Sequence, residues 1–428
     1  MTNSALTVVL SRIGSVTCGF FTLTLTAWGL GPSGRGVVAT GISLMLLFPL
    51  LLSGGLPSVM RRIWALQPPA SAAQHLLAAR ALALPLAAVS GLVATALLPV
   101  LAPSASSGIK WVLVGCIVTC TGAGTRWLND GSALLGSGRV GAYSLVLLTP
   151  SVLLAVVSLW LWATGELSVV AVLIAQAGAY LITAVASHLL VKMPSGVRRE
   201  PLLRVLREGL PYFGSQVAEA LSYRLDQVLV LGVIGAFGAG IYSISATVAL
   251  LPSTLGLAVA SATFQQVAAQ HQRDGRLADG SVVRVSLLAG AILTLVLAAA
   301  APYAIPIAFG QAFASAVIPT WIGLIGALFL VGTQASASIL IASGRGWHLT
   351  LAQVIGLGVG VLLLLIMGPR FGATGAAWAS ATGFFTTFII ALWATRLPLS
   401  ELLPRGSDVS RTVQVFVSGS LEPRRSDT

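Results

Sequence analysis

Polar side chains inside one apolar stretch are the first candidates for chemistry. Residues 209–232 are predicted to form a helix, and at about 100° per residue one face of it carries a polar stripe made of Gln216, Glu219, Tyr223 and Asp226. Arg224 projects about 140° away from Glu219 by the same periodicity. A lipid-facing helix would not tolerate such a stripe, so we expect it to face a cleft. A buried salt-bridge network that only holds helices together is the alternative.

Three more charged residues interrupt apolar segments: Arg12, Arg126 and Asp130. Ionisable residues inside a bilayer cost roughly 2.5–3.5 kcal/mol each, so each of them is a functional hypothesis. Asp130 follows Arg126 by one helical turn, and the two can pair. Arg12, Arg126 and Arg224 together would supply fixed positive charge, and arginine suits phosphate because its planar fork donates two parallel hydrogen bonds. Arg12 could instead extend to the headgroups of the cytoplasmic leaflet.

The composition indicates the setting of these charges. The chain has 428 residues, is 56% hydrophobic and only 8% charged, and has a mean hydropathy of +0.93. A helix of about 20 residues crosses ~30 Å of hydrocarbon, and apolar runs of that length continue to about residue 395. We therefore predict an all-α polytopic membrane protein whose twelve transmembrane helices span 5–30, 37–59, 81–103, 110–135, 141–163, 167–190, 209–232, 238–262, 284–308, 314–341, 349–367 and 374–395.

The distribution of basic residues predicts the orientation. The formal net charge is +12, but the Lys and Arg residues lie in short loops on one predicted side, which argues against nucleic acid as a partner. The opposite side keeps only Arg35, Lys110 and Arg370. The bias predicts that both termini are cytoplasmic, and the excess of Arg over Lys favours a bacterial plasma (inner) membrane. Residues 192–208 are expected to form a short basic amphipathic helix on anionic lipid headgroups.

An internal repeat predicts the architecture. "LLGSGR" at 134–139 returns as "LIASGR" at 340–345, and "GRGVVATGISLMLLFP" from Gly34 is echoed by "GAGIYSISATVALLP" from Gly238. Similar motifs in the same order at nearly the same spacing, 206 and 204 residues, indicate duplication. Six helices per repeat make the halves parallel, with a binding site expected in a central cavity between them. The predicted domains are an N-terminal six-helix lobe, a basic cytoplasmic linker, a C-terminal six-helix lobe and a polar cytoplasmic tail, at 1–195, 196–208, 209–396 and 397–428.

The chain resembles a known family in two long stretches. These are "SRIGSV…AWGLGPSGRGVVATGISLMLLFPLLLSGGLPSVMRR" and "GLPYFGSQVAEALSYRLDQVLVLGVIGAFGAGIYSISATVALLP". They are similar to polysaccharide biosynthesis flippases of the multidrug/oligosaccharidyl-lipid/polysaccharide exporter (MOP) superfamily. The resemblance implies two lobes with alternating access and a lipid-linked diphosphate oligosaccharide as substrate. Arg224 and Asp226 match the Arg-x-Asp of the family's seventh helix, and Arg12 matches its "SR-x-G".

Three functions remain open at this stage. The first is a flippase that moves a lipid-linked oligosaccharide from the inner to the outer leaflet for surface polysaccharide export. The others are an ion-coupled multidrug exporter of the same fold and a non-transporting subunit of a polysaccharide synthase. Expected partners are the lipid-linked oligosaccharide, membrane lipids and a polymerase or glycosyltransferases. No metal site, nucleophile–base pair or phosphate-binding loop is recognised, so neither an enzyme nor a cofactor is predicted, and coupling to H+ or Na+ is left open.

Overall fold

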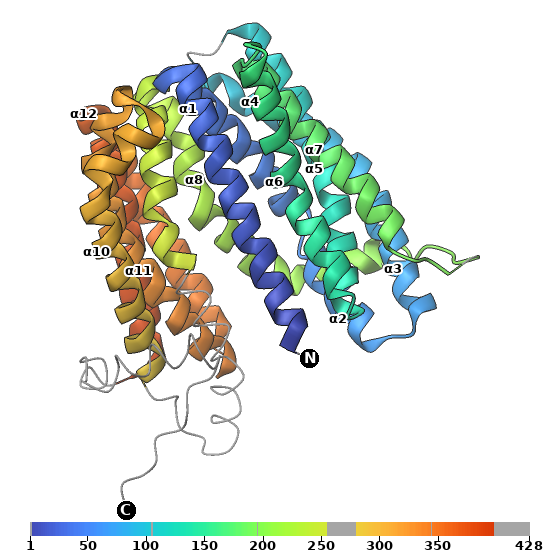
Figure 1. Ribbon diagram of the computed structural model, residues 1–428. Helices are drawn as coiled ribbons and strands as arrows, with labels where there is room; N and C mark the ends of the chain where they lie inside the picture. The colour runs from blue at the N-terminus through green and yellow to red at the C-terminus, as the bar shows by residue number, and fades with distance from the viewer. Residues whose placement is uncertain (1, 104–105, 195, 255–279, 344, 398–428) are drawn as a thin grey trace, which may run out of the picture. The chain divides into compact units, whose positions relative to one another are not determined.

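The computed structural model describes residues 2–103, 106–194, 196–254, 280–343 and 345–397 (Figure 1). Within these ranges the chain is helical and contains no strand. The helices are α1 Thr2–Leu52, α2 Leu56–Leu66, α3 Pro69–Ala81, α4 Ala83–Leu101, α5 Ser107–Gly136, α6 Val140–Ala163, α7 Val169–Leu190, α8 Leu202–Ala249, α10 Ser281–Phe309, the short 3₁₀ helix η1 Gln311–Ala316, α11 Val317–Ala342 and α12 Gly346–Thr395. They form two compact units, Met1–Gly240 (unit 1) and Ile241–Thr428 (unit 2), and α8 contributes to both.

The prediction of an all-α polytopic membrane protein is confirmed. Nine helices of the described ranges are long and apolar enough to cross a membrane. Three of the longest contain one glycine whose backbone is not helical: Gly31 in α1, Gly235 in α8 and Gly372 in α12. Their φ angles of 64°, 75° and 57° lie in the left-handed region that favours glycine. Each break falls at a turn that the sequence predicted, while the exact number of crossings stays a prediction.

The break at Gly31 reverses the direction of α1. Before the break, Ser15 Oγ donates to Leu147 O at 3.5 Å, and Gly29 lies against Trp162, so this half runs alongside α6 in the same direction. After the break, Gly41 lies against Leu173 of α7. Farther along, Pro49 of α1 and Tyr180 of α7 both lie against Gly124 of α5. The second half therefore runs alongside α7. Because α6 and α7 are consecutive helices joined by a turn at Gly165, the two halves of α1 form a hairpin.

The structure supports the internal repeat at positions that the sequence motifs did not include. Gly31 and Gly235 are 204 residues apart, the same separation as Gly36 and Gly240, and both break a helix with positive φ. The same separation joins Arg80 and Arg284, which are 6% and 3% exposed in their respective units. Each half therefore places a buried arginine and a glycine break at equivalent positions of the chain.

The two "SGR" turns have the same local structure. Arg139 N donates to Leu134 O at 2.9 Å and Arg345 N donates to Leu340 O at 2.7 Å, which closes the end of α5 and of α11. Each guanidinium also donates to a carbonyl at the end of another helix, Leu190 O for Arg139 and Ala394 O for Arg345. A cation at a helix carboxyl end stabilises the orphan carbonyls and the helix dipole. The arginine of the motif thus joins two helix ends.

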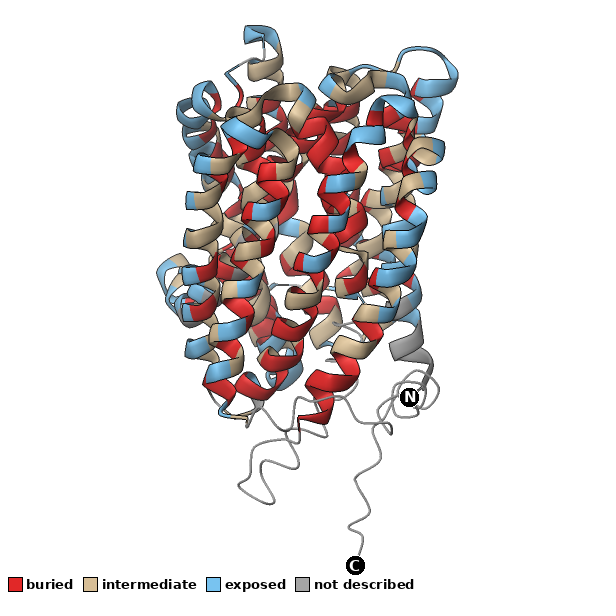
Figure 2. Cartoon of the chain, turned by 90° about the vertical axis from the view of Figure 1, so that its left-hand side faces the viewer, coloured by how far each residue is buried: buried red, intermediate tan, exposed pale blue. Residues whose placement is uncertain are grey.

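A cluster of buried apolar residues positions α2, α3 and α5 in unit 1. Its members include Leu56, Met60, Leu76 and Leu134, and Trp64 and Trp127 pack against it. Along the helices of Figure 2, buried faces alternate with exposed faces, as expected for helices that bury one side in protein and turn the other to lipid. This packing fixes the rotation of α5, and with it the direction of Asp130.

Several helix boundaries differ from the sequence prediction, and α3 lies between the predicted helices 37–59 and 81–103, where no helix was predicted. The predicted helix 37–59 ends at Leu52, and a turn with positive φ at Gly54 and Gly55 precedes the separate helix α2. Residues 202–208 form the first turns of the long α8, rather than a short separate helix. The predicted lobe boundaries at 195 and 208 stay a prediction. The predicted tail at 397–428 lies, except for Leu397, outside the described residues.

Candidate functional site

All the predicted site residues belong to unit 1, so their neighbourhoods can be described within one compact body. They come from three helices: Arg12 from α1, Arg126 and Asp130 from α5, and the others from α8. The side chains of Glu219 and Tyr223 lie outside the described residues. Whether the predicted stripe on α8 faces a cleft therefore stays a prediction.

Hydrogen bonds hold the first half of α8 against α1 and α2. Gln216 Nε2 donates to Ser58 Oγ of α2 at 2.7 Å. Farther along α8, the side-chain oxygen of Gln227 accepts from Ser43 Oγ at 2.9 Å, and its carbonyl accepts from Thr40 Oγ1 at 3.2 Å. Polar side chains that bond across helices fix the rotation of membrane helices. These bonds set the direction in which the residues between Gln216 and Gln227 project.

Arg224 lies between these two anchors and is half-buried. It interacts electrostatically with Tyr180 of α7 and with Asp226 on its own helix. Tyr180 is buried in the middle of α7, which runs from Val169 to Leu190, and its ring meets Trp127 of α5 edge-on, with centroids 5.8 Å apart. Arg224 is therefore a cation that interacts with a residue in the middle of a membrane-spanning helix.

One carboxylate oxygen of Asp226 is bound by the backbone of its own helix. Its Oδ1 accepts from the backbone N of Gln227 at 2.7 Å. Arg224 and Asp226 thus stand on one helix with opposite charges, and the carboxylate offsets part of the charge of the guanidinium.

Asp130 has a different partner from the one predicted. Its Oδ1 accepts from Arg80 Nε of α3 at 2.8 Å, and its Oδ2 accepts from Ser187 Oγ of α7 at 3.1 Å. Asp130 is 0% exposed, whereas Arg126 is exposed. A pair one turn apart on a helix needs both side chains to lean over the same turn. The predicted pairing of Arg126 with Asp130 is wrong, because Asp130 turns inward to α3 and α7.

Arg80 is the main residue that the sequence analysis missed at this site. It was assigned to the loop side of the membrane with the other basic residues, yet it is 6% exposed inside unit 1. Its flanking residues Ala78, Ala79 and Ala81 could have indicated that Arg80 is buried, because small side chains let helices approach closely and bury the residues between them. The structure places Arg80, Asp130 and Ser187 together and keeps Arg126 apart from them.

Arg12 is exposed near the beginning of α1, one residue after the buried Ser11. Its role as a substrate contact stays a prediction. Cys18, Cys116 and Cys120 are free thiols, and within the described ranges no three His, Cys, Asp or Glu side chains come close enough to hold a metal ion.

The comparisons with known proteins agree with the expected resemblance. A family model described as "Polysaccharide biosynthesis protein" matches residues 141–318. The fold is similar to that of the lipid II flippase MurJ in an inward closed conformation, with a TM-score of 0.74 at 12% identity over 96% of this chain and 92% of that one. No curated protein sequence matches the chain.

Multidrug transporters share this fold as well. An inward-facing multidrug resistance MATE family transporter of the MOP superfamily has a TM-score of 0.69 at 14% identity over 90% of this chain and 95% of that one. The MATE multidrug transporter DinF-BH has a TM-score of 0.63 at 15% identity over 94% of this chain and 96% of that one. The chain is thus a multi-pass helical membrane protein with the fold of these transporters, and residues 141–318 match the polysaccharide biosynthesis model.

Proposed function

We propose that the protein is a flippase that moves a lipid-linked diphosphate oligosaccharide from the inner to the outer leaflet of a bacterial plasma membrane, for surface polysaccharide export. The observation that carries the proposal is Arg224, a half-buried guanidinium that interacts with Tyr180 in the middle of a spanning helix of unit 1. Support comes from the match of residues 141–318 to polysaccharide biosynthesis proteins. Support also comes from the fold, which is similar to that of the lipid II flippase MurJ in an inward closed conformation. Transport by alternating access, with both termini cytoplasmic, is part of the proposal.

In this proposal Arg224 binds the diphosphate during its passage. The guanidinium stays charged when it is partly dehydrated and donates two parallel hydrogen bonds to phosphate oxygens. Asp226 keeps the site from binding the anion so tightly that release becomes slow, and Gln216 and Tyr223 contribute polar contacts. Arg12 and Arg126, both exposed, attract the headgroup. Glu219 is assigned to the charge network, and coupling to H+ or Na+ is part of the proposal.

The surroundings of Asp130 make this carboxylate unsuitable for an ion-coupled exporter of cationic drugs. Such an exporter needs a carboxylate that can bind a cation or a proton within the membrane. Asp130 is the carboxylate of α5, and Arg80 and Ser187 occupy both of its oxygens. A carboxylate bound in this way is a poor site for a cationic drug, so we assign it a structural role.

The test is headgroup translocation in proteoliposomes that contain the purified protein and a fluorescent undecaprenyl diphosphate oligosaccharide. We expect the Arg224→Ala variant to lose about tenfold to a hundredfold in initial rate, because a hydrogen bond to a charged group contributes about 1.5–3 kcal/mol. Arg224→Lys should keep part of the rate, since it retains the charge and loses the fork. Lys110→Gln, outside the proposed site, is the control and should match the wild type.

The same assay separates the alternatives. Wild-type protein that moves no lipid-linked headgroup but extrudes a cationic dye would identify a multidrug exporter. Protein that moves neither, while its deletion still abolishes surface polysaccharide, would identify a non-transporting subunit that acts with a polymerase or glycosyltransferase. An Arg224→Ala variant with the wild-type rate would refute the assigned site.

A further inference from the structure

The first turns of α8 lie on unit 1 with one face buried. Val205 is 0% exposed and belongs to the apolar cluster around Leu56 and Met60, and Leu202 and Leu206 pack against the same cluster. Gly209 continues this face, where an added Cβ would lie 2.4 Å from Gly54 O. The segment is therefore firmly seated, and its other face has a fixed direction.

The outward face mixes leucine with arginine. Leu203 is 72% exposed and Leu210 is 64% exposed, and Arg207 between them is exposed too. Positions 203, 207 and 210 follow the i, i+4, i+7 spacing of one helix face. Exposed leucines are unfavourable in water and arginines are unfavourable in hydrocarbon, so such a face suits the boundary between the two.

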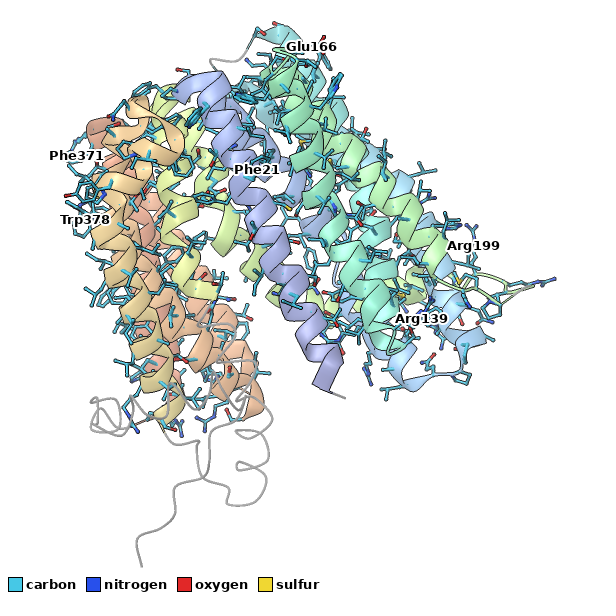
Figure 3. The ribbon with its side chains drawn as sticks, viewed as in Figure 1. Phe21, Arg139, Glu166, Arg199, Phe371 and Trp378 are labelled. Atoms are coloured by element: carbon cyan, nitrogen blue, oxygen red, sulfur yellow. The ribbon has the colours of Figure 1, made fainter. Side chains whose placement is uncertain are left out.

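The acidic residues of this region are bound inside it. Glu200 Oε2 accepts from Arg204 Nη1 at 3.4 Å, and Glu208 contacts Arg204 Nε and His75 Nε2, each at 3.5 Å. Arg204 is thus neutralised by carboxylates of its own segment. In contrast, no ion pair in the described ranges involves Arg198, Arg199, Arg207 or Lys192, all of which are exposed. Figure 3 shows Arg199 on the connection between α7 and α8, at the margin of the unit.

We propose that Leu203, Leu210, Arg198, Arg199 and Arg207 form a docking surface for anionic phospholipid headgroups in the adjacent leaflet. The leucines enter the acyl boundary, and the unpaired guanidiniums bind the lipid phosphates. Charge complementarity selects this occupant: the surface carries uncompensated positive charge beside apolar side chains, which a soluble anion would match only in part. The proposal does not depend on what the protein transports.

Native mass spectrometry of the full-length protein in detergent tests the surface, with phosphatidylglycerol and phosphatidylcholine of identical acyl chains as probes. We expect phosphatidylglycerol to bind more tightly. The triple variant Arg198→Gln, Arg199→Gln, Arg207→Gln should weaken this binding about a hundredfold, since each cation near a lipid surface contributes about fivefold, the equivalent of about 1 kcal/mol. The triple Arg→Lys variant should bind almost as the wild type does.

The control is the variant Lys110→Gln, Arg370→Gln, which removes one half-buried and one exposed cation elsewhere on the chain. It should leave phosphatidylglycerol binding unchanged. Equal binding of the two lipids to the wild type, or a triple Gln variant within twofold of it, would overturn the proposal. Competition by inorganic phosphate at the concentration of the lipid would do the same, because it would assign the surface to a free anion. If the Gln variant fails to fold, the Leu203→Ser, Leu210→Ser variant provides the test. Loss of phosphatidylglycerol binding would support the surface, and unchanged binding would overturn it.

Discussion

Asp130 shows how much one membrane-embedded carboxylate can require of its surroundings. A buried charge is tolerated when its partners satisfy it fully, and here two helices supply them: Arg80 from α3 and Ser187 from α7. The three residues join α3, α5 and α7 at one point. Trp127 lies on the same helix as Asp130 and packs against Tyr180, so this junction also positions the aromatic neighbour of Arg224.

Removing one member of the pair should be worse than removing both. Arg80→Ala or Asp130→Ala leaves an uncompensated buried charge, and we expect each to destabilise the protein by about 3–5 kcal/mol. The double variant Arg80→Met, Asp130→Leu should recover at least half of that loss, because no charge remains to be buried. Thermal unfolding of the purified protein in detergent measures both effects. Additive losses in the double variant would contradict the junction.

The sequence identified Asp130 as unusual but not its partner. An ionisable residue in an apolar run is visible in one dimension, and periodicity offered Arg126 one turn away. The choice between Arg126 and Arg80 depends on the rotation of α5, which is set by packing of Leu134 and its neighbours in the apolar cluster. That information is tertiary, so the pattern along one helix could not supply it.

At the scale of elements, glycines decide where helices meet. A Cβ added at Gly36 of α1 would lie 2.0 Å from Ala236 O, and one added at Gly240 would lie 1.8 Å from Pro32 O. The backbones of α1 and α8 are therefore in contact. They cross where the second half of α1 and the second half of α8 begin. Both glycines lie in the repeated segments that begin at Gly34 and Gly238, and the structure places them at a crossing with each other.

Gly36→Ala should weaken this crossing. The new methyl group meets backbone that cannot move aside, so we expect a loss of about 1–3 kcal/mol in unfolding free energy. Gly19→Ala in the same helix is the matched control, because nothing lies within 4 Å of its added Cβ. It should raise stability by roughly 0.5–1 kcal/mol, as expected for alanine in a helix. Two variants with equal effects would argue against the crossing.

Element positions were predictable where hydropathy alone determines them, as in α5 to α7. The break between α1 and α2 was not predicted, because Leu50 to Leu56 is apolar almost throughout and the turn depends on Gly54 and Gly55. Composition predicts where a membrane segment lies, but the residue at which it ends depends on glycines with positive φ, here Gly54 and Gly55.

At the scale of the whole molecule, the repeat makes a prediction about sidedness. If the halves are parallel, equivalent turns face the same side of the membrane. In a variant without Cys18, Cys116 and Cys120, a cysteine placed at Ser137 or Ser343 should react with a membrane-impermeant thiol reagent from the cytoplasmic side only. A cysteine at Glu166 or Arg370 should react from the opposite side only.

The measurement is labelling in intact cells and in inverted membrane vesicles. Opposite accessibility of positions 137 and 343 would exclude parallel halves. The same accessibility for positions 137 and 166 would show that α6 does not cross the membrane. The central cavity that the repeat predicts stays a prediction at this scale.

The glycine breaks also bear on how the chain is made. Gly31, Gly235 and Gly372 each join two long apolar segments with no loop between them. During synthesis the second segment emerges from the ribosome directly behind the first, and so short a connection gives the pair no room to enter the bilayer separately. Each pair is therefore expected to insert as one hairpin, and a charge such as Arg35, which donates to Thr26 across the first break, can enter the membrane already bonded to its partner helix.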